Sequence, residues 1–121
     1  MEIHEFVAKY YFHDSFIKGI ENDIEHSLVK IIVHLCNWLQ DSYTSEQSEI
    51  LVLQIVFKNV SAFQFEHVES KFSDEIIDLK VTKLSEGRCR LEFILNQPNN
   101  TRLLRFETSC VEVEIKSSYN H

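Results

Sequence analysis

Apolar residues recur along this chain with two different periods, and the change of period separates a helix from a series of strands. Near the N-terminus the apolar side chains fall three and four positions apart on one helical stripe, namely Ile3, Phe6, Val7, Tyr10 and Tyr11. This spacing predicts an amphipathic helix from about Glu2 to Tyr11. The polar residues His13, Asp14 and Ser15 then interrupt the pattern, because short polar side chains compete for backbone hydrogen bonds.

After residue 15 the apolar period is two, which is typical of β-strands. Val29, Ile31, Val33 and Leu35 alternate with polar or charged neighbours such as Lys30 and His34. The segment from Ile50 to Phe57 is almost continuously apolar, which predicts a central strand covered on both faces. Shorter patterns of the same kind predict strands near residues 16–21, 63–66, 77–82, 89–95, 104–106 and 111–115.

The connections between these segments decide the fold class. Glu86 and Gly87 predict a hairpin turn, and Gly19 predicts a bulge or a close approach within its strand. Between Phe106 and Val111 the apolar set slips by one residue, so we expect a bulge or bend from Thr108 to Cys110. Connections of this length are too short for βαβ crossovers, which favours antiparallel pairing.

The predicted fold is α+β and mainly β: a short N-terminal helix followed by about seven antiparallel strands in a curved sheet or open barrel. At 121 residues the chain corresponds to a single domain, residues 1–121. Only two glycines and one proline are present, few for so many turns. A partly helical segment from Ile24 to Trp38 is therefore the alternative.

Composition and charge exclude several functional classes. The net charge is −7 and no cluster of Lys and Arg is apparent, which argues against nucleic-acid binding and suits a basic protein partner. The N-terminus lacks a basic segment followed by an apolar one, and no apolar run approaches a membrane span. We therefore expect a cytoplasmic protein without membrane contact. Cys36, Cys89 and Cys110 cannot all pair internally, which favours reduced, buried thiols.

The candidate functional positions are His13, Asp14 and Ser15, which together contain the three residue types of a hydrolase triad. Consecutive residues rarely reach triad geometry, so we expect Asp14 and Ser15 to bond backbone amides where the helix gives way to the first strand. A catalytic role would need His13 and Asp14 to converge with more distant side chains in a cleft. The histidines and cysteines show no zinc-site spacing, and two glycines cannot form a phosphate loop. We predict no catalytic, metal or cofactor-binding residues and no enzymatic activity.

The same tripeptide carries a family resemblance over about 35 residues. An aromatic residue, His13-Asp14-Ser15, the pattern Phe16-Ile17-x-x-Ile20, a polar turn and an apolar strand from Leu28 to Leu35 follow one another. This order resembles small uncharacterised bacterial families, some of which are immunity proteins of contact-dependent or polymorphic toxin systems. The resemblance implies a stoichiometric protein binder that needs no catalytic residue.

The predicted function is therefore that of a non-catalytic protein-binding domain of the bacterial immunity-protein kind, with a basic partner. The alternative is a small-molecule carrier, because nine Phe, four Tyr and one Trp could line a cavity inside a curved sheet. An exposed edge strand could also pair with a second copy, so a homodimer is a further expectation.

Overall fold

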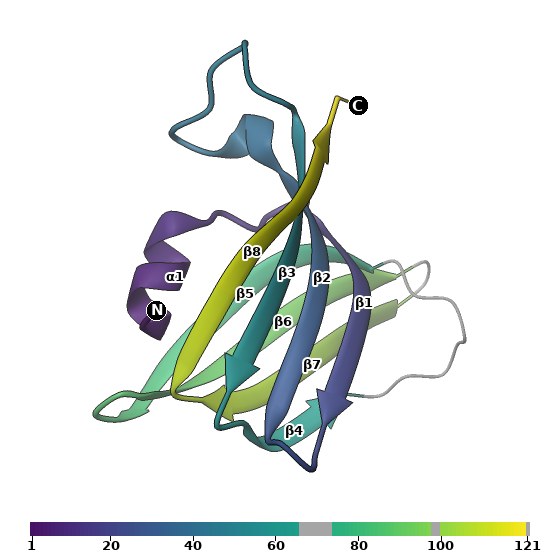
Figure 1. Cartoon of the computed structure of the whole chain (residues 1–121). Coiled ribbons are helices and arrows are strands. Elements are labelled where there is room, and N and C mark those ends of the chain that lie inside the picture. The colour runs from purple at the N-terminus through teal and green to yellow at the C-terminus, as the bar shows by residue number, and fades with distance from the viewer. Residues whose placement is uncertain (66–73, 98–99, 121) are drawn as a thin grey trace.

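The computed structural model describes residues 1–65, 74–97 and 100–120, and within these ranges it contains one short α-helix and eight strands in one antiparallel sheet (Figure 1). The elements are α1 (Ile3–Lys9), β1 (Phe16–Asp23), β2 (Leu28–Cys36), the 3-10 turn η1 (Asn37–Leu39), β3 (Ile50–Lys58), β4 (Ser61–Phe65), β5 (Asp74–Ser85), β6 (Arg88–Gln97), β7 (Asn100–Thr108) and β8 (Cys110–Tyr119). The predicted α+β, mainly β fold is confirmed. Residue 66, the end of the predicted strand 63–66, lies outside the described residues.

The sheet is folded over into two layers, which Figure 1 shows one behind the other. Its strand order is β4-β7-β6-β5-β1-β2-β3-β8. We call β1, β2, β3 and β8 the front layer and β4, β5, β6 and β7 the back layer. The layers are hydrogen-bonded through β1 and β5, at two residue pairs, Phe16 with Glu75 and Ile17 with Asp74. The result is a strongly curved, unclosed sheet.

On the other side the chain passes between the layers at two bends, from β3 to β4 and from β7 to β8. The bend predicted from Thr108 to Cys110 is confirmed, since β7 ends at Thr108 and β8 begins at Cys110. The buried Thr108 hydroxyl donates to the Lys58 carbonyl oxygen, 2.5 Å away, and so ties the two bends together. Because the chain changes layer here, Phe106 and Val111 both face the interior despite the one-residue slip.

The interior between the layers is a packed apolar core. Both layers and the N-terminal segment contribute fully buried side chains, among them Phe6, Ile17, Ile31, Val33, Leu53, Ile55, Phe57, Ile76, Leu91, Phe93, Leu95, Leu104 and Phe106. The helix is shorter than predicted, because Tyr10 takes an extended backbone with φ −120° and ψ 131°. Its Phe6 nevertheless reaches the core, where the ring lies 5.6 Å from that of Phe57 at an interplanar angle of 88°.

Local predictions were confirmed unevenly. The alternation of β2 is confirmed, and this segment is a strand followed by η1 rather than a longer helix. A register shift between Ile17 and Gly19 confirms the bulge, and Gly87 takes a φ of 74° in the hairpin turn. In β5 the core residue is Ile76 rather than Ile77, because a second register shift follows it. All three cysteines are free, but only Cys36 is buried.

The strand predicted to be covered on both faces is covered on one. β3 lies between β2 and β8, and its inner side chains Leu53, Ile55 and Phe57 have no exposed surface. Its outer side chains Val52 and Val56 are only half-buried. No described element lies over this outer side. β3 therefore has the composition of a strand that is covered on both faces, but one of its faces is open.

Candidate functional site

His13, Asp14 and Ser15 lie where the front and back layers join. The Asp14 amide donates to the carbonyl oxygen of Ile76 at 3.0 Å, and the Ile76 amide donates to the carbonyl oxygen of Ser15 at 2.7 Å. Asp14 has a φ of 67°, in the left-handed region that Asp and Asn enter more readily than most residues. The tripeptide therefore continues the pairing of β1 with β5.

The Ser15 hydroxyl has the role expected of it. Its side chain is fully buried, and Oγ accepts the backbone N–H of Cys36 at 2.9 Å. The Cys36 thiol in turn donates to the Asp14 carbonyl oxygen at 3.2 Å, and burial raises the pKa of this thiol. Hydroxyl and thiol are thus both engaged in bonds that hold β2 against the start of β1.

The Asp14 side chain differs from its expectation. Its carboxylate does not cap a backbone amide; Oδ1 lies 3.4 Å from Nε2 of His13, and both side chains are about half exposed. The other ring nitrogen of His13, Nδ1, lies 2.6 Å from the carbonyl oxygen of Ile77, at the register shift of β5. The imidazole and the Ser15 hydroxyl therefore contact different backbone groups, and the three side chains do not form a triad.

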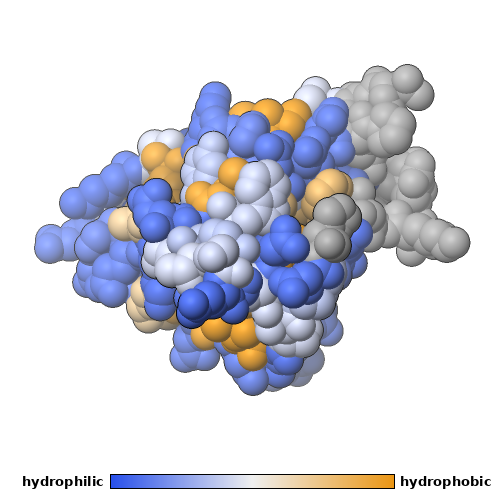
Figure 2. All heavy atoms as spheres, turned by 90° about the horizontal axis from the view of Figure 1, so that it is seen from above, coloured by the Kyte–Doolittle hydropathy of each residue, from blue (hydrophilic) through white to orange (hydrophobic). Residues whose placement is uncertain are grey.

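Asp14 also lines a groove of about 340 Å³ on the outer face of the front layer. The other lining residues are mainly apolar or aromatic: Phe16, Lys18, His34, Cys36, Trp38, Ile50 and Tyr119. Figure 2 shows the molecule from the end that carries η1, where hydrophobic patches interrupt a mostly hydrophilic surface. Sequence reasoning did not select this groove.

Strand pairing explains how these residues meet. Phe16 of β1 lies opposite His34 of β2, which lies opposite Val52 of β3. In the next row outward, Cys36 lies opposite Ile50, and Ile50 opposite Tyr119. Phe16, His34 and Val52 point outward because Ile17, Val33 and Leu53, their neighbours in the chain, face the core. The second row lies two residues away from the first in β2 and β3, on the same side of the sheet.

Three aromatic side chains of the groove remain open to solvent. Phe16 is 37% exposed, Trp38 48% and Tyr119 42%. Large aromatic side chains usually bury most of their surface, so three of them around one groove form an apolar patch.

One hydrogen bond fixes the floor of the groove. Nδ1 of His34 lies 2.9 Å from the Tyr119 hydroxyl, which reaches across β3. Burial, with a smaller contribution from the Lys18 charge, lowers the pKa of His34 and favours its neutral form. The Lys18 ammonium itself lies 5.2 Å from the centre of the Phe16 ring.

An acidic loop borders the Trp38 end of the groove. No Lys or Arg occurs between Lys30 and Lys58, whereas the loop between η1 and β3 carries Asp41, Glu46 and Glu49. The carbonyl oxygen of Glu49 accepts the Trp38 amide at 3.3 Å, which places this loop beside the tryptophan. The surroundings of the groove therefore carry a local excess of negative charge.

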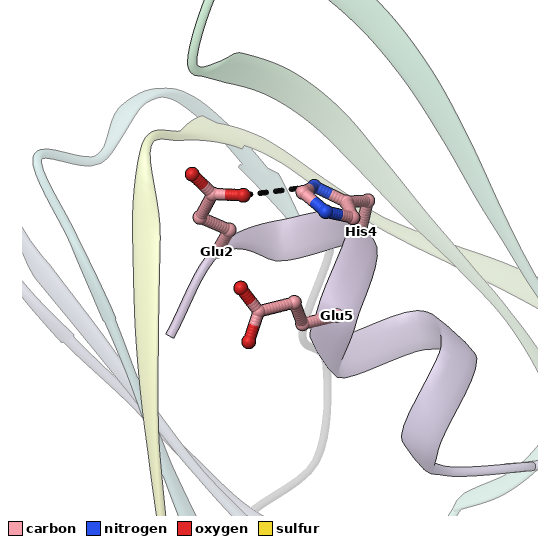
Figure 3. Close-up of side chains that lie close together, drawn as sticks. All are labelled: Glu2, His4 and Glu5. Atoms are coloured by element: carbon pink, nitrogen blue, oxygen red, sulfur yellow. Dashed lines mark ion pairs between the residues drawn. The ribbon is translucent and has the colours of Figure 1, made fainter.

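A second cluster of polar side chains lies on α1 (Figure 3). One ligand-type atom from each of Glu2, His4 and Glu5 lies within 4.8 Å of the others, and Nδ1 of His4 is 3.2 Å from a Glu2 carboxylate oxygen. All three side chains are exposed. Exposed acidic groups often lie this close without an ion, so this cluster by itself does not indicate a metal site.

The aromatic residues considered for a ligand cavity pack against one another. The rings of Phe57 and Phe106 are 4.8 Å apart, and Phe93 lies 6.4 Å from each of them. These fully buried rings fill the space between the layers that a ligand would need. This packing does not support the alternative function of a small-molecule carrier.

Comparisons with protein-family models, curated proteins and solved structures found no match to this chain. Among the described residues, no helix has both the length and the apolar character required to cross a membrane.

Proposed function

We propose that this chain is a non-catalytic protein-binding domain of the bacterial immunity-protein kind, and that a basic partner protein covers the outer face of the front layer. We call this surface the front face; it comprises Phe16, His34, Ile50, Val52 and Tyr119 of the strands, with Trp38 at its end. The observation that carries the proposal is the outer side of β3, where Val52 and Val56 are only half-buried and no described element covers them.

The exposed aromatic residues favour a protein as the occupant. Trp and Tyr are enriched among the residues that contribute most to binding energy at protein interfaces, whereas single exposed aliphatic residues are common everywhere. Trp38 and Tyr119 border the same groove, and Phe16 completes it. A partner that covers these rings would also bury the outer side of β3.

Charge favours a basic partner. The chain carries 19 acidic and 12 basic residues, and the loop beside Trp38 contributes three carboxylates without a Lys or Arg. Complementary charge around an apolar centre speeds association and rejects wrong partners. The resemblance of the segment around His13-Asp14-Ser15 to toxin-system immunity families agrees with this assignment, because such proteins act by binding.

The groups nearest the groove support a role without catalysis. The Ser15 hydroxyl accepts a buried amide, and burial raises the pKa of the Cys36 thiol, which disfavours the nucleophilic thiolate. Each of these side chains has a structural bond instead of a base beside it. In a binding domain, these side chains need only hold the strands in place.

Co-expression tests the proposal. The chain is produced together with each protein encoded by the genes that flank its own, and complex formation and growth protection are measured. We expect one flanking product to be basic, to be toxic when expressed alone, and to form a stable complex with this chain that restores growth.

Two matched variants locate the contact. Val52→Glu places a carboxylate on the outer side of β3, and Ile94→Glu places one at a half-buried outer position of β6. We expect Val52→Glu to weaken the complex at least about 100-fold, since an unpaired charge at an interface centre costs several kcal/mol. Ile94→Glu should change the affinity of the complex by less than about threefold. The proposal would be contradicted if no flanking product forms a complex with this chain, or if co-expression does not restore growth. It would also be contradicted if both variants lose affinity for the partner equally.

A further inference from the structure

We infer that the groove between Asp14, Phe16, Trp38 and Tyr119 binds the guanidinium group of an arginine side chain on the partner. This inference rests on the proposed function, because it names the group that the front face recognises. It follows from the chemistry of the lining, which combines three partly exposed rings with one carboxylate.

The faces of aromatic rings attract cations, and tryptophan does so most strongly. A guanidinium group suits this groove better than an ammonium, because it is planar, weakly hydrated and able to stack on a ring while it donates to a carboxylate. The Asp14 carboxylate is half-exposed at the groove and lies beside His13 rather than on a backbone amide. A carboxylate in this setting retains the capacity to accept an additional donor.

The chain itself places a cation on one of these rings. The Lys18 ammonium lies 5.2 Å from the centre of the Phe16 ring, within the range of a cation–π contact. Lys18 belongs to the bulge of β1, where the extra residue leaves the regular row of side chains. An arriving guanidinium would contact the Trp38 and Tyr119 side of the groove, next to the acidic loop, and Asp14 would offset the Lys18 charge.

The other titratable groups that face the groove agree with this assignment. His34 lies between Lys18 and Tyr119, and burial favours its neutral form. The Cys36 thiol is protonated in its bond to the Asp14 carbonyl oxygen. Among the described residues that line the groove, Lys18 carries the one positive charge and Asp14 the one negative charge. A volume of about 340 Å³ is sufficient for a single large side chain and lies at the lower end of the range for ligand sites.

Tryptophan fluorescence provides the test, because Trp38 is the only tryptophan of the chain. Two blocked pentapeptides, Ac-Gly-Ser-Arg-Ser-Gly-amide and the same peptide with citrulline in place of arginine, are titrated into the whole protein. Citrulline has nearly the same shape without the charge. We expect the arginine peptide to bind about five- to thirtyfold more tightly, as a partly desolvated cation–π contact predicts.

Variants assign this preference to the groove. Asp14→Asn keeps a residue that tolerates the left-handed backbone, and Tyr119→Ala removes a ring on the side that the guanidinium would contact; each should reduce the preference for arginine to less than about twofold. Tyr11→Ala truncates an exposed aromatic residue outside this groove and should leave the preference unchanged. Circular dichroism of every variant confirms that the fold is retained.

Three results would overturn the inference: equal binding of both peptides, no change of Trp38 fluorescence with either at millimolar concentration, or a preference that survives Asp14→Asn and Tyr119→Ala. If any of these occurs while Val52→Glu alone still disrupts the partner complex, the arginine site is wrong and the proposed function stands. If the partner complex is also absent, both are wrong.

Discussion

The outer faces of the two layers follow the same strand alternation and carry different chemistry. On the back layer, the outward side chains of β6 and β7 form opposed ion pairs. A nitrogen of Arg90 lies 3.7 Å from a Glu107 carboxylate oxygen, and one of Arg105 lies 3.9 Å from Glu92. The front layer also has cross-strand ion pairs, Lys30 with Glu21 and Lys58 with Glu112, at the end away from η1. Toward η1, its outer rows contain Phe16, Val52 and Ile50 instead.

The difference shows which face is complete in the isolated chain. Charged pairs directly opposite each other stabilise a sheet surface that stays in water. Apolar side chains in the same position are not stabilised by contact with water. Only another segment or another molecule that packs over the strands could bury them. The paired charges of β6 and β7 therefore suit an ordinary solvent surface, whereas the end of the front face toward η1 resembles one side of an interface.

The inner faces should not show this difference. Leu53 of β3 and Leu91 of β6 have no exposed surface, and both face the common core. We expect Leu53→Ala and Leu91→Ala each to lower the free energy of unfolding by about 2–5 kcal/mol, because each leaves a cavity. Urea titration followed by circular dichroism measures the change. A loss below about 1 kcal/mol in only one of the two would mean that the layers do not share one core.

The junction between the layers should depend on the Ser15 hydroxyl. Ser15→Ala removes the acceptor of the Cys36 amide and leaves a buried N–H without its partner. We expect unfolding to become easier by about 1–3 kcal/mol, with no change of partner affinity beyond about twofold. The same titration and a binding curve with the partner are sufficient. A variant of unchanged stability that loses binding would instead assign Ser15 a direct role in function.

The charged face of the back layer should respond weakly and in a salt-dependent way. Strand register places Glu92 between Lys80 and Arg105, so Glu92→Lys sets three positive charges in one row. We expect Glu92→Lys to lower the free energy of unfolding by about 1 kcal/mol relative to Glu92→Gln at low salt. The difference between the two variants should be smaller at high salt. A gap independent of salt would show that these side chains act through packing rather than charge.

Sequence reasoning predicted the elements that depend on local pattern. The helical stripe, the alternation of β2, the Gly19 bulge and the bend after Thr108 all follow from the spacing of apolar residues along the chain. It was wrong where tertiary context decides. In β3 a nearly continuous apolar run predicts cover on both faces, and the intrachain fold provides it on one.

The candidate site was located only in part for the same reason. Ser15 was expected to bond a backbone amide, and it does, but the identity of that amide depends on the pairing of β1 with β2. The groove combines residues from β1, β2, η1, β3 and β8, which are up to 105 positions apart between Asp14 and Tyr119. No local motif reports such an assembly, although the apolar run of β3 and the nearby Trp38 were visible signals.

Side-chain footprinting with hydroxyl radicals distinguishes a partner on the front face from a partner on the back face. Oxidation rates are compared for the chain alone and for its complex with the partner from the flanking gene. We expect the rates at Trp38, Tyr119 and Phe16 on the front face to fall at least about fivefold, because exposed rings that enter an interface core are shielded from solvent. Those at Ile94 and Leu103 on the back face should stay unchanged. Protection of the back-face pair with free oxidation of Trp38 and Tyr119 would contradict the proposed contact.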